Sequence, residues 1–270
     1  MSRGGGRARP EPLPGIVDSH AHLQHAAFDA DREAVVERAR EAGIVAILVP
    51  GWDLASSEAA LELAARFPDL VTAAVGVHPH HADQLDEPAA VRLEALAGDP
   101  RCGAIGEIGL DLYRLLSPAD VQRAAFERQL EMASAVGKPV VVHDRDAHEP
   151  VATALRGWTG PRGREIRGVL HCFSGDTAMA TELAASGYLV SFALSVTFGR
   201  WRGSREAAAT LPLEALLVET DSPYLGAGPE RRNEPTTVLR VATELARYRG
   251  TSPADVASAA ATAYRRLLDG

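Results

Sequence analysis

Short apolar runs alternate with amphipathic stretches from residue 16 onward. Eight runs rich in Val, Ile, Leu and Ala begin near Ile16, Ile44, Val71, Cys102, Pro139, Arg167, Tyr188 and Leu216. Between them, helical periodicity covers about 29–42, 54–66, 83–98, 118–137, 146–156, 176–187, 204–211 and 236–249. Strands that are apolar throughout belong to parallel sheets buried on both faces, and this alternation is typical of βα units. We therefore predict an α/β fold, a single (β/α)8 TIM barrel.

The remaining segments fit around this barrel. A further helical stretch, about 253–268, begins at Ser252-Pro253 and should pack on the barrel as an extra C-terminal helix. No GxGxxG follows a predicted strand, which disfavours a doubly wound open sheet. Residues 1–15 are rich in Gly, Pro and Arg, so we expect a disordered N-terminal tail before one domain over residues 16–270.

Composition excludes several classes of protein. No apolar stretch is long enough to span a membrane, and a net charge of −8 argues against non-specific coating of nucleic acid. Nucleic acid stays open as a substrate, because cations in a pocket can supply local positive charge. Cys102 and Cys172 form no CxxC, so we expect no disulfide scaffold, and we predict a cytoplasmic protein without an obligate protein partner.

The histidines and carboxylates proposed for the site follow the apolar runs. In a barrel these positions converge on the C-terminal rim, where active sites are built. Six of these side chains form a nitrogen and oxygen ligand set typical of zinc or another transition metal: His20, His22, Glu107, His143, His171 and Asp221. They are too many for one tetrahedral ion with an open position. They indicate two divalent ions about 3.5–4 Å apart with a shared carboxylate, as in phosphate ester chemistry.

Glu107 is the candidate shared carboxylate, because Gly106 and Gly109 leave room around it. The chain's one lysine, Lys138, starts the fifth run about 16 Å from His143, which excludes a modified lysine as the bridge. Glu219 shares a face with Asp221 and either orients a ligand or forms a buried ion pair. Imidazoles favour zinc, while shared carboxylates are compatible with Mg²⁺ or Mn²⁺.

Three aromatic side chains near the predicted rim have two possible roles each. Tyr113, Phe173 and Tyr224 lie near strand ends, where they either pack structurally or stack on bases. Three histidines fall in loops or at helix starts, where we expect solvent exposure: His25, His81 and His148.

Seven motifs in order resemble those of the TatD-type deoxyribonuclease family, from about Val17 to the C-terminus: DSHAHL, GVHPHH, AIGEIGLDLY, KPVVVHDRDA, GVLHCFSG, VETDSPYL and RRNEP. The resemblance implies a TIM barrel with a binuclear divalent metal site. It also implies action on DNA, often as a 3′-to-5′ exonuclease on single strands. Two places depart from the family pattern. Residues 226–230 lack the Arg-Gly often found before RRNEP, and Ala263 stands where the terminal helix often has Asn.

The resemblance also implies a role for each matched residue. One ion would be held by His20, His22, Glu107 and Asp221, and the other by Glu107, His143 and His171. It further implies that His78 and Arg145 approach the substrate phosphate and that Asp221 handles the proton of the attacking water.

From the ligand set and the resemblance together, we predict a phosphodiester hydrolase that acts on single-stranded DNA or 3′ ends. Glu107 and Asp221 would be its catalytic groups, and Arg145 or Arg232 would clamp phosphate oxygens. Two other functions stay open at this point. One is an amide or ester hydrolase (deacylase) with the same two metals, and the other is an inactive barrel that acts as a binding protein.

Overall fold

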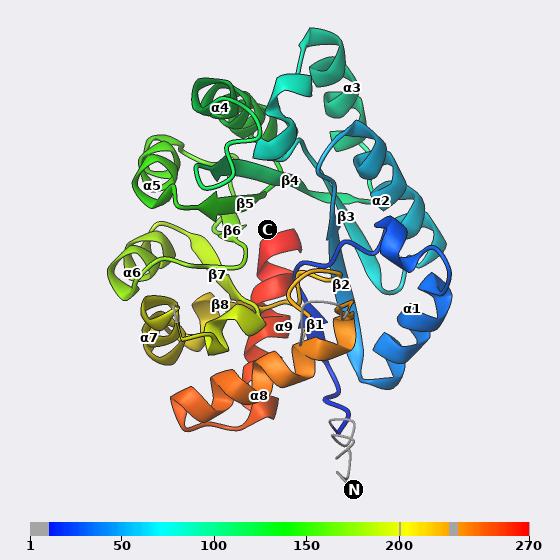
Figure 1. The fold of residues 1–270 in the computed structure, drawn as a ribbon, viewed down its shortest axis with the longest axis vertical. Coiled ribbons are helices and arrows are strands. Elements are labelled where there is room, and N and C mark those ends of the chain that lie inside the picture. Colours follow the sequence, from blue (N-terminus) through cyan, green and yellow to red (C-terminus); the bar gives the residue numbers. More distant parts are fainter. Residues whose placement is uncertain (1–10, 200, 227–231, 270) are drawn as a thin grey trace, which may run out of the picture.

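Eight parallel strands form one sheet in the computed structural model, which describes residues 11–199, 201–226 and 232–269. Each strand pairs with its sequence neighbours, in the order β1 to β8, and Figure 1 shows them as a ring inside a layer of helices. The strands are β1 (Ile16–Asp18), β2 (Ile44–Pro50), β3 (Val71–Val75), β4 (Cys102–Asp111), β5 (Val140–Arg145), β6 (Gly168–Leu170), β7 (Tyr188–Phe192) and β8 (Leu216–Val218). The predicted TIM barrel is confirmed.

The ring closes between β8 and β1 through Asp18, the last residue of β1, and through residues just beyond the two strands, and we call this junction the seam. Ala21 forms a parallel bridge with Ser222. Asp18 accepts hydrogen bonds from Thr220 N–H at 2.9 Å and from the Thr220 hydroxyl at 2.7 Å. The seam therefore joins the segment after β1 to the segment after β8.

Each strand is followed by a helix, as expected from the alternation. The helices of the described chain are α1 (Arg32–Glu41), α2 (Leu54–Arg66), α3 (Glu87–Ala97), α4 (Ala119–Val136), α5 (His148–Gly157), α6 (Thr177–Ala185), α7 (Arg202–Thr210), α8 (Val238–Arg249) and α9 (Pro253–Asp269). Short 3₁₀ turns are η1 (Ala26–Phe28), η2 (Pro79–Gln84), η3 (Leu194–Thr197), η4 (Leu213–Ala215) and η5 (Pro235–Thr237). Within the described residues, no helix has the length and apolar character of a membrane span.

Aspartates fix the start of several helices. Asp53, Asp86 and Asp176 each accept a hydrogen bond from the backbone N–H three residues later, at the N-termini of α2, α3 and α6. Such caps satisfy donors that a helix leaves unpaired in its first turn. They set where the loops at the C-terminal ends of β2 and β6 stop and the helices begin.

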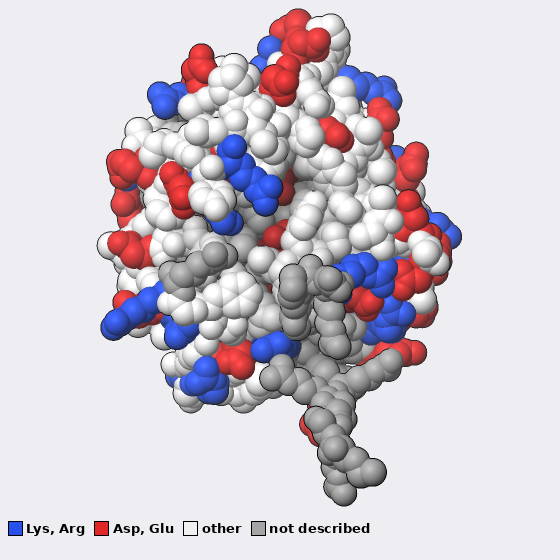
Figure 2. Space-filling model, in the orientation of Figure 1, with Lys and Arg blue, Asp and Glu red and all other residues white. Residues whose placement is uncertain are grey.

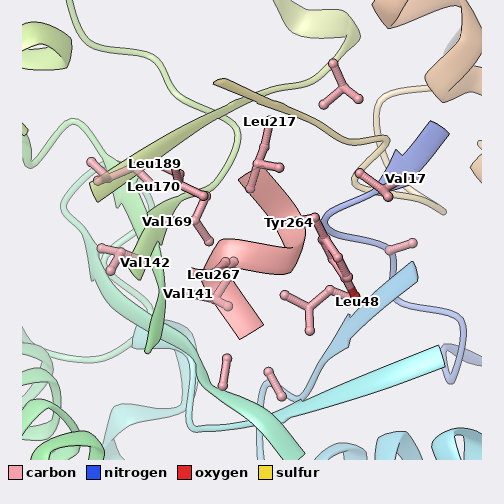
Figure 3. Close-up of a cluster of buried hydrophobic side chains, with 14 of the residues drawn as sticks. Val17, Leu48, Val141, Val142, Val169, Leu170, Leu189, Leu217, Tyr264 and Leu267 are labelled. Atoms are coloured by element: carbon pink, nitrogen blue, oxygen red, sulfur yellow. The ribbon is translucent and has the colours of Figure 1, made fainter. Parts of the chain in front are cut away.

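The predicted extra helix is present as α9, and it closes one end of the barrel. Tyr264 and Leu267 are buried in the same cluster as strand residues such as Val141 and Leu217, and Figure 3 shows α9 among them. Next to them, Leu268 lies so close to Gly103, at the start of β4, that a Cβ there would sit 3.0 Å from its Cδ2. Because α9 fills the N-terminal end, the C-terminal rim is the end that can hold a site.

The N-terminal tail is described only from residue 11. Leu13 N–H donates to Ala42 O and Gly15 N–H donates to Gly43 O, each at 3.0 Å, so this part lies along the turn between α1 and β2. Residues 1–10 of the predicted disordered tail lie outside the described residues.

Candidate metal centre

Histidine and carboxylate side chains converge at the C-terminal rim. His20 and His22 follow β1, and their Nε2 atoms lie 3.2 Å apart. Asp221, which follows β8, places Oδ1 3.9 Å from His20 Nε2 and 3.7 Å from His22 Nε2. The face seen in Figure 2 is hollowed near its centre, with acidic atoms at the floor and basic side chains along one edge.

Glu107 on β4 is the centre of this cluster. Its Oε2 lies 3.3 Å from His20 Nε2. Its Oε1 lies 2.8 Å from His171 Nε2, after β6, and 2.9 Å from His143 Nδ1, on β5. The structure thus brings all six predicted ligands together around one carboxylate.

Glycines beside Glu107 let neighbouring strands approach. Gly109 has φ +138°, and a Cβ there would lie 2.0 Å from the carbonyl oxygen of His143. A Cβ on Gly106 would lie 2.5 Å from Cβ of Val141. The space was expected to surround Glu107 itself, but it is taken by β5, which brings His143 within reach of the carboxylate.

These donors fit divalent cations. Three groups have ligand atoms within 4.8 Å of one another: His20, Glu107 and His171; His20, His22 and Asp221; His78, Glu107 and His143. Nε2 of His20 and Nε2 of His22 lie 3.2 Å apart and both face oxygens of Glu107 and Asp221, so a proton held between the two nitrogens leaves those oxygens without a donor from either ring. Buried polar groups need partners, so a cation between these nitrogens and carboxylates accounts for the arrangement.

Burial keeps two histidines of the cluster neutral, whereas nearby carboxylates raise the pKa of His143 and of His171. Burial lowers the pKa of His22 to about 3 and that of His78 to about 3, so both are neutral at pH 7 with lone pairs free for coordination. Burial also raises the pKa of Glu107, but the imidazoles around it, His171 first, outweigh this and hold its pKa well below the ordinary value. Burial raises the pKa of Asp221 to about 6.

Glu219 orients one of the histidines, which is one of the two roles left open by the sequence. It is fully buried, its Oε1 lies 3.2 Å from His171 Nδ1, and the same oxygen accepts the N–H of Cys172 at 2.6 Å. A carboxylate on the far nitrogen of an imidazole fixes its tautomer and ring orientation. His171 therefore presents Nε2 to the cluster.

Asp111 at the end of β4 contacts the cluster, and the sequence analysis gave it no role. Its Oδ2 accepts a hydrogen bond from His80 Nε2 at 2.6 Å and lies 3.5 Å from His143 Nε2. Its Oδ1 accepts the N–H groups of Tyr113 and Arg114. The signal was its place after an apolar run, the same rule that identified the other rim residues.

Two buried glutamines on α4 hold strand ends that carry site residues, and they were also missed. Gln129 accepts Val77 N–H at 2.7 Å and donates to Val77 O at 3.0 Å, just before His78. Gln122 likewise accepts Asp111 N–H at 2.8 Å and donates to Asp111 O at 3.1 Å. Polar residues seven positions apart on a buried helix face were the available signal.

The three predicted substrate-binding residues have different surroundings. His78 lies in the cluster, with Nε2 3.4 Å from Glu107 Oε1. Arg145 lies beside it, at the end of β5. Arg232 forms ion pairs with Asp31 at 2.5 Å and Glu234 at 2.8 Å, so its guanidinium is engaged away from the cluster. Contact of these residues with a substrate stays a prediction.

The rim aromatics separate into packed and exposed residues. Phe173 is in the core, which favours its structural reading, whereas Tyr113 and Tyr224 are 62% and 50% exposed. Trp52, which sequence reasoning did not consider, lies edge-on to His22, with ring centroids 5.4 Å apart.

His25 was expected in solvent and is half-buried, with its ring 5.8 Å from that of Tyr224. Residues 227–230 of the loop before RRNEP, and the first arginine of that motif, lie outside the described residues.

Comparisons with known proteins cover nearly the whole chain. A sequence profile described as "TatD related DNase" matches residues 17–269. The chain is 36% identical over 262 residues to "3'-5' ssDNA/RNA exonuclease TatD" of Erwinia tasmaniensis, covering 94% of this chain and 100% of that protein. It is 34% identical over 256 residues to "Uncharacterized metal-dependent hydrolase YabD" of Bacillus subtilis, covering 94% and 98%. The crystal structure of YJJV, a TatD homologue from Escherichia coli K12, superposes with a TM-score of 0.87 at 29% identity, covering 96% and 99%.

Proposed function

The chain belongs to the TatD related DNase family of metal-dependent hydrolases, and from this premise we propose that it removes nucleotides from the 3′ ends of single-stranded DNA with two divalent cations. The observation that carries the proposal is the position of Glu107, whose two oxygens face histidines from different strands. A relative of 36% identity is named a 3′-5′ exonuclease of single-stranded DNA and RNA, which supports this substrate class.

In this proposal the donor set divides between two ions. His20, His22 and Asp221 would hold one ion, His143 and His171 would hold the other, and Glu107 would contribute to both. Supporting this division, the first three residues form one of the groups with mutually close ligand atoms. His143 Nδ1 and His171 Nε2 lie 3.3 Å apart, both beside Glu107 Oε1. Zinc, magnesium and manganese are all compatible with this mixture of imidazoles and carboxylates.

When bound, a pair of divalent cations acidifies a water and neutralises charge on the attacked phosphoryl group. The chain's own residues position the reactants. Asp221 lies at the edge of the cluster with its side chain 15% exposed, where it accepts the proton of the attacking water. His78 and Arg145 bind non-bridging oxygens of the phosphate and hold it in line with that water. A strand end enters the hollow more readily than a duplex, which favours single strands.

The test is hydrolysis of 5′-labelled single-stranded oligonucleotides by the purified protein with Mg²⁺, Mn²⁺, Zn²⁺ or EDTA. We expect metal-dependent shortening from the 3′ end and its loss in Glu107→Ala. The matched control is Glu131→Ala, because Glu131 is an exposed glutamate on α4. Absence of metal-dependent cleavage, or equal activity of the two variants, would overturn the proposal. Turnover of acyl substrates alone would place the activity on carbonyl groups.

A further inference from the structure

A second polar pocket lies beside the metal centre. It has a volume of about 270 Å³ and is lined by Tyr113, Arg145, Asp146, His148, Ser174 and Trp201, and we call it the Arg145 pocket. Arg145 lies two residues beyond His143 on β5. The N–H of Tyr113 donates to Asp111, whose other oxygen lies 3.5 Å from His143. The pocket and the metal centre therefore take residues from the same two segments, the end of β5 and the end of β4 with the residues that follow it.

The guanidinium group of Arg145 packs against two aromatic rings of the pocket. The guanidinium carbon of Arg145 lies 4.8 Å from the ring centroid of Tyr113 and 5.9 Å from that of Trp201. In the part of the chain that the structure describes, no carboxylate forms an ion pair with Arg145, in contrast to Arg232. Stacking on ring faces leaves the N–H groups at the guanidinium edge available to an anion.

His148 supplies a second donor. Its Nδ1 lies 2.7 Å from Oδ2 of the buried Asp144, which fixes the ring and leaves Nε2 as the nitrogen that can face a ligand. The hydrogen bond to Asp144, with smaller contributions from the charges of Asp146 and Asp176, raises the pKa of His148. The ring is therefore protonated over a wider range of pH than an unpaired histidine. The sequence predicted that His148 is exposed to solvent. In the structure its side chain is instead held by the hydrogen bond to Asp144.

The polar groups lining the pocket suit an anion held by hydrogen bonds. Arg145 supplies N–H groups that no carboxylate of the described residues engages, and His148 supplies Nε2. Because the exposed carboxylate of Asp146 also lines the pocket, a phosphodiester with one negative charge fits better than a terminal phosphate with nearly two. The flanking rings of Tyr113 and Trp201 add flat faces on which a base can stack.

Building on the proposed function, we propose that the Arg145 pocket is a second phosphate subsite. It binds the phosphodiester next to the scissile one through His148 and through those N–H groups of Arg145 that the scissile phosphate does not use, while the attached base stacks on Tyr113 or Trp201. The enzyme then distinguishes a chain with two consecutive phosphodiesters from a compound with only one. Because the pocket and the metal centre are built on neighbouring residues of β5 and of the end of β4, one strand can occupy both.

The experiment compares the thymidine dimer TpT, which has one phosphodiester, with the trimer TpTpT and with a trimer whose non-scissile linkage is a neutral methylphosphonate. For the wild type with Mn²⁺ we expect kcat/KM to be at least about tenfold higher for TpTpT than for either other substrate, as a charged hydrogen bond of about 1.5–3 kcal/mol implies. His148→Gln and Trp201→Leu should reduce this ratio. His81→Gln is the matched control, because the side chain of His81 bonds exposed Gln84 outside the pocket.

Calorimetric titration of TpTpT in EDTA gives a second readout that does not need cleavage. We expect weaker binding of TpTpT to His148→Gln than to the wild type, and no difference between the two proteins for the methylphosphonate trimer, because only the charged linkage meets His148. An unchanged substrate ratio and unchanged affinity in both pocket variants would overturn the subsite while leaving the proposed function intact. A wild type that binds TpTpT through His148 but cleaves nothing would overturn the proposed function instead.

Discussion

Replacement of Gln129 by leucine tests how α4 supports the site. Gln129 is fully buried, and its amide holds both backbone groups of Val77, the residue before His78. Leucine has nearly the same volume but no polar atom. The N–H and C=O of Val77 therefore lose this partner while they stay buried.

The magnitude follows from those two groups. A buried backbone group without a partner costs about 1–3 kcal/mol, so the pair costs about 2–6 kcal/mol. Burial of an apolar side chain in place of the amide offsets about 1–2 kcal/mol. We expect the free energy of unfolding to fall by about 3 kcal/mol, which lowers the urea midpoint by about 1 M at an m-value of about 3 kcal/mol/M.

The assay is urea unfolding followed by circular dichroism for the wild type, Gln129→Leu and the control Gln84→Leu. Gln84 is exposed and its side chain bonds His81 at 3.1 Å, so its replacement should change stability by less than about 0.5 kcal/mol. A Gln129→Leu midpoint equal to that of the wild type, or equal losses in both variants, would refute the reasoning. Because Val77 precedes His78, KM for oligonucleotides should also rise in Gln129→Leu, with the metal content unchanged.

Three further predictions concern stability, pH and metal binding. Leu267→Ala should leave a cavity where α9 fills the barrel end and cost about 2–5 kcal/mol, and an unchanged thermal midpoint would contradict that packing. Hydrogen bonding to Arg232 lowers the pKa of Asp31 to about 2, so its contribution to stability is present above the unfolded pKa of about 3.9 and is lost as the pH falls towards 2. The stability difference between wild type and Asp31→Asn should therefore shrink over that range, and a difference independent of pH would show that Asp31 acts otherwise. Glu219→Ala leaves His171 Nδ1 without its carboxylate and should weaken metal binding about 10- to 100-fold in competition with a chelator, whereas equal affinity would exclude the orienting role.

The barrel and the ligand cluster could be predicted because both follow from short-range patterns. Period-two alternation places His20 and His22 on one side of a strand end, and parallel strands bring their C-terminal ends to one rim. These rules need no knowledge of side-chain packing. They were sufficient to place Glu107, His143 and Asp221 near the first two histidines.

The remaining features depend on packing that a linear pattern does not encode. Asp111 follows the same rim rule as Glu107, but its approach to His143 depends on the register that pairs it with Arg145 on β5. In the sequence, Gln129 only interrupts an apolar helix face. Its role is visible in the structure, where its amide bonds both backbone groups of Val77. Helix α9 has the same periodicity whether it covers the wall of the barrel or fills its end.

The seam has a consequence for how the protein folds. The hydrogen bonds of Asp18 with Thr220 join residues 202 positions apart, and contacts of such long sequence separation carry a high loop-closure cost and form slowly. His20 and His22 lie on one side of this junction and Asp221 on the other, so the donor set is incomplete until the ring has closed. A cation that binds only after β8 has met β1 would stabilise the closed ring by mass action, so metal binding and closure of the barrel are thermodynamically coupled.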